Sequence, residues 1–346
     1  MSRVLLIGGS RFIGKEIARQ ARAAGHEVAL FNRGVTAPEG PAVKGDVKDL
    51  ERHAPRLRAL KPDVVVHCIA YTEKDAADCV AVFAGTGARV IVLSSMDCYD
   101  AFQNANRGLE TSDFPVDESM PTTPIRHYWR GFAHPRAEDY DRNLMTDRFL
   151  AAQRAGSLPC VVLRLPMVYG PEDPQYRHRH GEAIRRIYDK ERSFPISSRD
   201  QARLGTHGYV ENVAAAVVHC FASDKAAGRV YNIGEGSVRT QRRWADLFAK
   251  AAGWEFDFQV LPEELMAKDR KSRNRPAQHL VFDCSLFIKE TAFSSPVGLE
   301  EGIAKTLAWG LAHPDALGPR PDYAAERRLV AAYGRAMDGL RAMPRL

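Results

Sequence analysis

The predicted fold rests first on the segment Val4-Leu5-Leu6-Ile7-Gly8-Gly9-Ser10-Arg11-Phe12-Ile13-Gly14. Its first four residues form a short, wholly apolar run, which is typical of a strand in a parallel sheet covered by helices on both faces. Apolar side chains then recur at helical spacing as far as Ala21, and Gly25 ends the predicted helix. Since residues 28–31 are again apolar, the segment predicts a strand, a helix and a second strand.

The glycines of this stretch have a chemical use in that context. Gly8 permits a tight turn after the strand, and Gly14 lets the helix pack closely on the sheet. The helix N-terminus offers unpaired N–H groups and the positive end of its dipole to a pyrophosphate. The stretch therefore predicts a dinucleotide site, against the alternative of a plain strand-to-helix turn. The expected contacts with the cofactor in this stretch are Gly8, Ser10, Arg11, Phe12, Ile13 and Gly14.

Two positions of the unit concern the choice of cofactor. Arg11 stands where the middle glycine of the usual pattern would be, and Asn32-Arg33 follow the second strand where an acidic residue would bind the ribose of NAD. An acid at that position repels a 2′-phosphate, whereas an arginine attracts it. We therefore expect NADP rather than NAD, with Asn32 and Arg33 among its contacts. The alternative is that both arginines are solvated surface charges.

Further apolar runs continue the alternation of strands and helices. They lie at residues 42–46, 64–70, 90–95 and 160–165, with helical segments between them. This order predicts an α/β fold with a Rossmann-type doubly wound parallel sheet, whose ligands bind at the carboxyl ends of the strands.

The bulk properties of the 346-residue chain narrow the class of ligand only slightly. Its formal net charge of +6 favours anionic ligands. The six cysteines show no CxxC spacing, and we find neither a signal-peptide pattern nor an apolar run long enough to span a membrane. We therefore expect a cytoplasmic protein with no membrane partner. His178 and His180 lack a cysteine or carboxylate at ligand spacing, so we expect no metal site.

Seven segments of the chain, taken together and in their order along it, resemble the extended short-chain dehydrogenase/reductases, which are also called NAD-dependent epimerase/dehydratases. The resemblance runs from Arg3 to about Pro314 and is more specific than any one segment alone. The matching segments are residues 8–14, 31–34, 45–47, 94–95 with Tyr99, 164–171, 208–214 and 231–234.

The resemblance implies an organisation in domains. Residues 1–170 would form the dinucleotide-binding domain, to which residues 205–235 return. Residues 171–315 would form a smaller C-terminal substrate-binding domain, and residues 316–346 a C-terminal helical tail, whose apolar stripe from Leu329 to Leu340 must pack on the body or on another subunit.

The resemblance also implies roles for single residues. Asp46 and Val47 would flank the adenine, Ala70 would lie along the ribose, and Pro166 and Val168 would lie near the nicotinamide. Ser95 would be the catalytic hydroxyl. The substrate pocket would be lined by Tyr128, Arg177, Arg203, His207 and Tyr209.

The sequence departs from the family at its catalytic Tyr-x-x-x-Lys pair, which occurs nowhere in the chain. The helix expected to carry it, at residues 137–155, offers Glu138 and Arg142 or Asp139 and Asn143 instead. Arg142 would hold the cofactor ribose in place of the lysine but cannot relay a proton, because it stays charged. The proton donor would then be Tyr140, or otherwise Glu138 or Tyr128.

Three functions remain open at this point. The first is an NADP-dependent reductase or epimerase acting on a carbonyl or hydroxyl carbon of a polar, anionic small molecule. The second is other chemistry at the same site, such as a lyase step. The third is cofactor binding without turnover, including RNA binding, because residues 9–14 and 30–34 also resemble the chloroplast stem-loop-binding proteins. No stacking stripe for RNA is evident, so we do not expect a nucleic-acid partner.

The resemblance further implies a homodimer. The family commonly pairs subunits through the two helices predicted near residues 75–85 and 137–155. Small apolar side chains on the first of these suit close packing.

Overall fold

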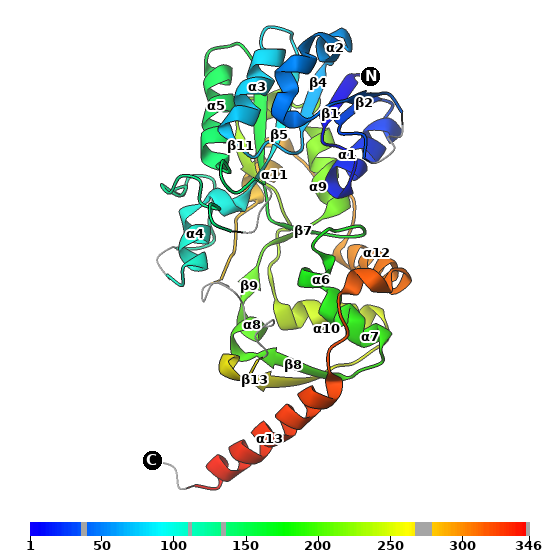
Figure 1. Cartoon of the computed structure of the whole chain (residues 1–346), viewed down its shortest axis with the longest axis vertical. Coiled ribbons are helices and arrows are strands. Elements are labelled where there is room, and N and C mark those ends of the chain that lie inside the picture. The colour runs from blue at the N-terminus through cyan, green and yellow to red at the C-terminus, as the bar shows by residue number, and fades with distance from the viewer. Residues whose placement is uncertain (36–39, 110–112, 133–135, 267–278, 344–346) are drawn as a thin grey trace.

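A seven-stranded, wholly parallel sheet is the centre of the fold, in the order β11-β6-β5-β4-β1-β2-β3 (Figure 1). The computed structural model describes residues 1–35, 40–109, 113–132, 136–266 and 279–343. The strands of the sheet are β1 (Arg3–Ile7), β2 (Glu27–Asn32), β3 (Ala42–Lys44), β4 (Val64–His67), β5 (Arg89–Ser95), β6 (Cys160–Leu165) and β11 (Val230–Asn232). The predicted Rossmann-type α/β class is thereby confirmed, although the third and fourth strands end earlier than their apolar runs suggested.

Helices cover both faces of this sheet, and the alternation of side chains along β1 decides which core each residue joins. Val4 and Leu6 pack in one cluster with residues of α1 and α9, whereas Leu5 and Ile7 pack in the other with residues of α3 and α5. The covering helices are α1 (Phe12–Ala23) and α9 (Val210–His219) on one face, and α2 (Ala54–Ala59), α3 (Glu73–Phe83) and α5 (Arg142–Arg154) on the other.

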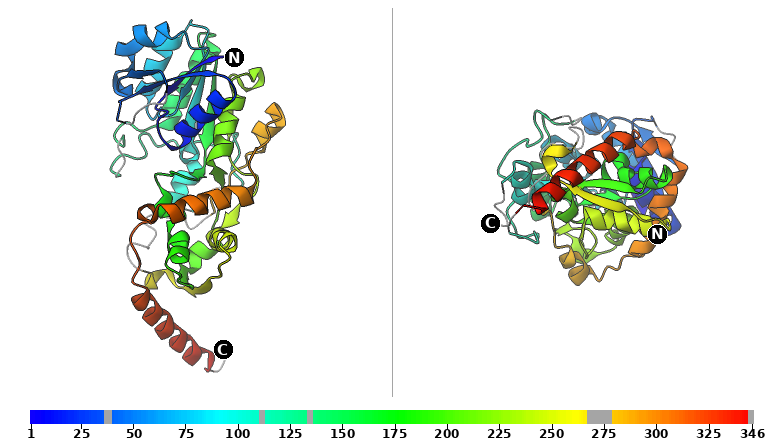
Figure 2. Two further views of the ribbon diagram at one scale, coloured as in Figure 1. Left: turned by 90° about the vertical axis from the view of Figure 1, so that its right-hand side faces the viewer. Right: turned by 90° about the horizontal axis from the view of Figure 1, so that it is seen from below.

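A second unit lies below the carboxyl ends of the strands (Figures 1 and 2). The parallel pair β7–β10 lies between the units, and the parallel pair β8–β13 closes the lower one. Its elements are β7 (Met167–Tyr169), α6 (Tyr176–Arg179), α7 (Gly181–Tyr188), β8 (Ser193–Ser197), α8 (Ser198–Ala202), β9 (Leu204–Gly205), β10 (His207–Tyr209), β12 (Arg239–Thr240), α10 (Gln241–Ala251), β13 (Asp257–Leu261) and α12 (Leu299–Ala312).

The remaining elements are short, apart from the last helix. The short helix α11 (Ser285–Thr291) lies against β11, and α4 (Asp100–Asn106) follows the turn after β5. The 3-10 turns are η1 (Val47–His53), η2 (Met96–Cys98), η3 (Asp224–Ala226), η4 (Glu263–Leu265) and η5 (Pro314–Leu317). Within the described ranges, no helix combines the length and the apolar character needed to cross a membrane.

The C-terminal helix α13 (Tyr323–Arg341) extends away from the body (Figure 1). Its first turn is attached because Tyr323 donates to Asp189 at 2.7 Å and the buried Arg186 donates to Glu326 at 2.9 Å. Beyond that turn the predicted apolar stripe stays at least partly exposed, and Leu340 is 56% exposed. The stripe therefore does not pack on the body of its own chain.

The helix predicted at residues 137–155 is shorter than expected, because α5 begins only at Arg142. Asp141 caps it, accepting hydrogen bonds from the N–H groups of Asn143 and Leu144, both at 3.0 Å. Glu138 and Tyr140 therefore lie in a turn before the helix, and helical spacing does not relate them to Arg142.

Candidate active site

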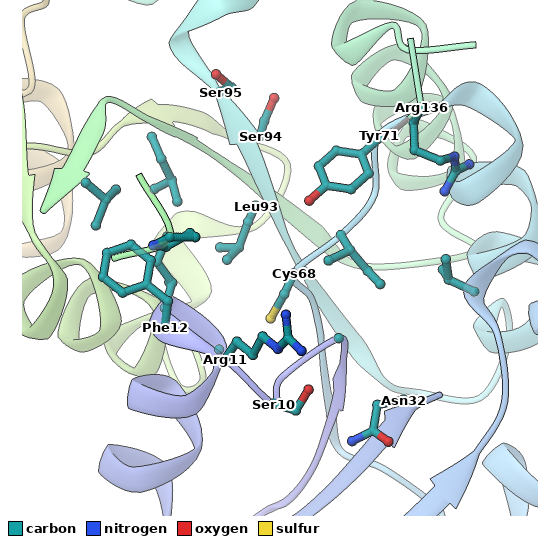
Figure 3. Close-up of a pocket in the computed structure, with 18 of the residues that line it drawn as sticks. Ser10, Arg11, Phe12, Asn32, Cys68, Tyr71, Leu93, Ser94, Ser95 and Arg136 are labelled. Carbon is teal, nitrogen blue, oxygen red and sulfur yellow. The ribbon is translucent and has the colours of Figure 1, made fainter. Parts of the chain in front are cut away.

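A cavity of about 650 Å³ opens at the carboxyl ends of β1, β4 and β5 (Figure 3). This edge is where doubly wound sheets bind their ligands. Its lining includes twelve of the thirteen residues that the sequence assigns to the cofactor: Gly8, Ser10, Arg11, Phe12, Ile13, Gly14, Asn32, Arg33, Asp46, Val47, Pro166 and Val168.

The glycine turn is as tight as its sequence predicts. Gly8 has φ +86°, and a Cβ on it would lie 2.8 Å from the side chain of Ile69. A Cβ on Gly14 would lie 2.6 Å from the Cα of Gly9, which is backbone and cannot move aside cheaply. Arg11 occupies the N-cap of α1 without a side-chain hydrogen bond, so its side chain does not cap the N–H groups of the first turn.

Cations outnumber carboxylates in the corner beyond β2. Arg11, Arg33 and Lys48 are exposed and line it together with Asp46, which accepts a hydrogen bond from the N–H of Lys48 at 3.0 Å. The side-chain amide nitrogen of Asn32 is buried and has no hydrogen-bond partner among the described residues. A ligand with phosphate and polar oxygen atoms fits such a corner.

The other end of the cavity is reached by β5 and by the chain after β4 and β6. Ser94, Ser95, Tyr71, Arg142 and Leu165 line it. Ser95 accepts a hydrogen bond from the N–H of Asp97 at 3.2 Å, whereas the buried Oγ of Ser94 has no partner within the described ranges. Together with the glycine cradle, this unsatisfied hydroxyl fits a dinucleotide that runs the length of the cavity.

Arg142 connects the chain after β4 to β5 at this end of the cavity. Its guanidinium donates to the carbonyls of Ala70 and of Leu93, the latter at 2.7 Å, and lies 4.6 Å from the ring centre of Tyr71. Burial works against its charge, but Tyr140, Tyr71 and Asp97 outweigh burial and raise the pKa of Arg142. Ala70 itself is buried and does not line the cavity, although its carbonyl anchors a residue that does.

The two tyrosines considered as proton donors belong to a buried network around Asp97. Tyr140 donates to the Asp97 carboxylate at 2.8 Å, Tyr128 at 3.2 Å and the indole of Trp129 at 2.9 Å. Burial raises the pKa values of Tyr128 and Tyr140 far above their ordinary range. Neither tyrosine lines the cavity, and Glu138 pairs with Arg130 at 3.4 Å on the surface.

The residues expected to bind substrate do not meet at the cavity either. His207 is 3% exposed and packs 4.4 Å from the ring of Trp244, and burial lowers its pKa to about 3. Tyr209 donates to Glu211 at 2.9 Å, and Arg203 lies 3.7 Å from Asp200. Arg177 is exposed and donates to His178 at 2.8 Å. From the same part of the chain, Asp173, Pro174 and Arg179 line the cavity instead.

Several further lining residues also have a signal in the sequence. Tyr71 directly follows the fourth apolar run, Ser94 precedes Ser95, and Lys48 lies two residues after Asp46. Each occupies the carboxyl end of a predicted strand or the turn after one, which is where such sheets place functional groups. No three His, Cys, Asp or Glu side chains come together as metal ligands in the described part of the chain.

Comparisons with known proteins agree with this geometry. The profile of the NAD dependent epimerase/dehydratase family matches residues 4–234. The 2′-dehydrokanamycin reductase of Streptomyces kanamyceticus is 24% identical over 273 residues, which cover 77% of this chain and 71% of that reductase.

Solved structures share the fold. The NAD complex of Thermus thermophilus UDP-glucose 4-epimerase matches at TM-score 0.65 and 21% identity, covering 90% of this chain and 99% of that one. The Stenotrophomonas maltophila UDP-glucose-4-epimerase with bound NAD matches at TM-score 0.71 and 16% identity, covering 91% of this chain and 100% of that one. The profile match spans well over half of the chain, so the chain belongs to the NAD-dependent epimerase/dehydratase family.

Proposed function

We propose that this protein is an NADP-dependent reductase or epimerase that acts on a carbonyl or hydroxyl carbon of a polar, anionic small molecule. The observation that carries the proposal is the corner formed by Arg11, Arg33 and Lys48 at the end of β2, where no acidic residue stands at Asn32. Two or three cations there favour a 2′-phosphate, whereas an acid would repel it.

The chemistry at the other end of the cavity follows from membership of the family. A bound nicotinamide would supply or accept a hydride, and Pro166 and Val168 would form the wall beside it. Arg142 would hold the neighbouring ribose, since its charged side chain reaches the cavity from a buried position. The positively charged side chains that line this end of the cavity support an anionic substrate. The similarity to a reductase supports reduction as one direction of the reaction.

Cofactor selectivity tests the first part of this proposal. Isothermal titration of the wild type should give NADP+ at least about tenfold tighter binding than NAD+, because charge-assisted hydrogen bonds to a phosphate contribute about 1.5–3 kcal/mol. Arg33→Ala should remove most of that difference. Arg52→Ala removes the same charge from an exposed position outside the cavity and should leave it intact. Equal affinities in the wild type would contradict the proposal.

Turnover tests the second part. NADPH oxidation should be measured with a panel of keto sugar acids, each paired with the uncharged keto sugar of the same skeleton. We expect reduction of at least one acid, faster than that of its neutral partner. Tight cofactor binding without turnover of any ketone would favour a binding protein instead.

We further propose a cytoplasmic homodimer. All six cysteines are unpaired, which suits a reducing compartment. Helices α3 and α5 pack side by side, and Ala77, Val80, Ala81 and Ala84 leave a small, partly exposed apolar surface on α3. Light scattering should give twice the mass of the chain, and Ala81→Arg should halve it. A wild-type monomer at micromolar concentration would contradict the dimer.

A further inference from the structure

Two hydroxyl side chains line the cavity where the family's catalytic tyrosine is missing. They are Tyr71, directly after β4, and Ser94, on β5. We propose that Tyr71 exchanges the proton of the reacting oxygen and that Ser94 hydrogen-bonds the same oxygen. This inference rests on the proposed function and names the groups that would carry out its chemistry.

The position of Tyr71 is set by its neighbours. Its ring stacks on that of Tyr140 with centres 5.9 Å apart and an interplanar angle of 23°, and the Arg142 guanidinium lies 4.6 Å from its centre. Figure 3 shows its hydroxyl at the cavity, pointing toward β5 near Leu93. A ring held in this way presents its hydroxyl in a fixed direction, beside a permanent positive charge.

The position of Ser94 is unusual for a serine without a ligand. The residue is 3% exposed, its Oγ has no hydrogen-bond partner among the described residues, and it lines the cavity. Buried hydroxyl groups are almost always hydrogen-bonded, so this one calls for an atom supplied by a ligand. Ser95, by comparison, caps η2 and already accepts from the N–H of Asp97.

The other two tyrosines of this region lie away from the cavity. The hydroxyls of Tyr140 and Tyr128 both donate to Asp97, and neither ring lines the cavity. Tyr140 instead supports the lining of the cavity, because its ring stacks on that of Tyr71 and its hydroxyl accepts a hydrogen bond from Arg142 at 3.0 Å.

The proposed step balances in the direction of reduction. The carbonyl carbon gains a hydride, which carries the two electrons by which NADPH is oxidised and the substrate reduced. The electron pair of the C=O π bond moves to the oxygen, which takes the proton of Tyr71 and forms the new O–H bond. The resulting phenolate lies beside the Arg142 charge and regains a proton from water.

Nitration of tyrosine by tetranitromethane, followed by peptide mass spectrometry, tests the placement without any turnover. In the free protein, Tyr71 should be nitrated while Tyr128 and Tyr140 are not. NADP+ should protect Tyr71, whereas 2′,5′-ADP, which lacks the nicotinamide half, should not. The exposed Tyr188, outside the cavity, is the control and should react under all three conditions. An unreactive Tyr71, or a Tyr140 that NADP+ protects, would overturn the inference.

Single substitutions test the chemistry on the ketone of the panel that the wild type reduces fastest. Tyr71→Phe and Ser94→Ala should each lower kcat about 100-fold or more while NADP+ affinity, measured by titration, stays within about threefold. Tyr188→Phe should retain full activity. Normal turnover in Tyr71→Phe would refute the proton role. Failure of the proposed function would look different, since the wild type itself would then bind no NADP+ or reduce no ketone.

Discussion

Two regions of the molecule, one around β1 and one around β10, differ in what fills them. Around β1, glycines without side chains keep the space open, and the cavity passes between Gly8, Gly14 and the strand ends. Around β10, by contrast, the rings of His207, Trp244 and Tyr169 are in contact and fill the space between them. The difference teaches that a polar residue in the right segment serves a ligand only where the backbone beside it leaves room.

The largest effect should come from Arg142, which lines the cavity and donates hydrogen bonds to the chain at the strand ends. Arg142→Met leaves the carbonyls of Ala70 and Leu93 without their donor and puts an apolar chain beside Asp97. We expect a loss of about 3 kcal/mol in the free energy of unfolding, measured in urea, together with most of the NADP+ affinity. Arg148→Met, at an exposed position of the same helix, is the control. A loss no larger than that of the control would contradict the structural role of Arg142.

Closing the open region should have the next largest effect. Gly14→Ala places a Cβ 2.6 Å from the Cα of Gly9, so the turn must shift. We expect about 2 kcal/mol of destabilisation and at least about tenfold weaker NADP+ binding. Gly334→Ala, where a Cβ meets nothing within 4 Å in the exposed helix α13, should instead stabilise by up to about 1 kcal/mol. Unchanged cofactor affinity in Gly14→Ala would mean that the ligand binds elsewhere.

The filled region should respond to pH. Burial lowers the pKa of His207 to about 3, so the unfolded chain takes up its proton near pH 6.5 while the folded protein does not. Stability should therefore fall as the pH drops from about 6.5 toward 3. His207→Gln should flatten that slope by up to about 1.4 kcal/mol per pH unit in urea unfolding at a series of pH values. An identical slope in the variant would show that His207 is hydrated, as a residue of an open site would be.

The smallest effect should come from an exposed ion pair between α1 and the loop after β7. Lys15 on α1 pairs with Glu172, in the loop after β7, at 2.6 Å, and both side chains are about half exposed. Exposed pairs contribute about 1 kcal/mol or less. Glu172→Gln should therefore change NADP+ affinity less than about threefold in a titration. A tenfold loss would make this loop part of the binding site itself.

The same two regions differ in how well the sequence predicts their structure. The residues that line the cavity could be predicted because the glycine turn and the strand ends are backbone features, fixed by local apolar runs and by Gly8 and Gly14. The catalytic region could not, because the start of α5 depends on the Asp141 cap, which moved Glu138 and Tyr140 out of the helix. The space beside His207 is filled by Trp244, which lies far along the chain, and no local sequence pattern predicts such a contact.

Hydrogen–deuterium exchange of the full chain, with and without NADP+, tests the contrast between the two regions most directly. Bound cofactor should slow exchange in peptides covering residues 8–14, 45–48, 68–71 and 93–95, which line the cavity. Peptides covering residues 203–209, and those from α13, should exchange at the same rate in both states. Slower exchange at residues 203–209 with no change at the glycine turn would contradict the account.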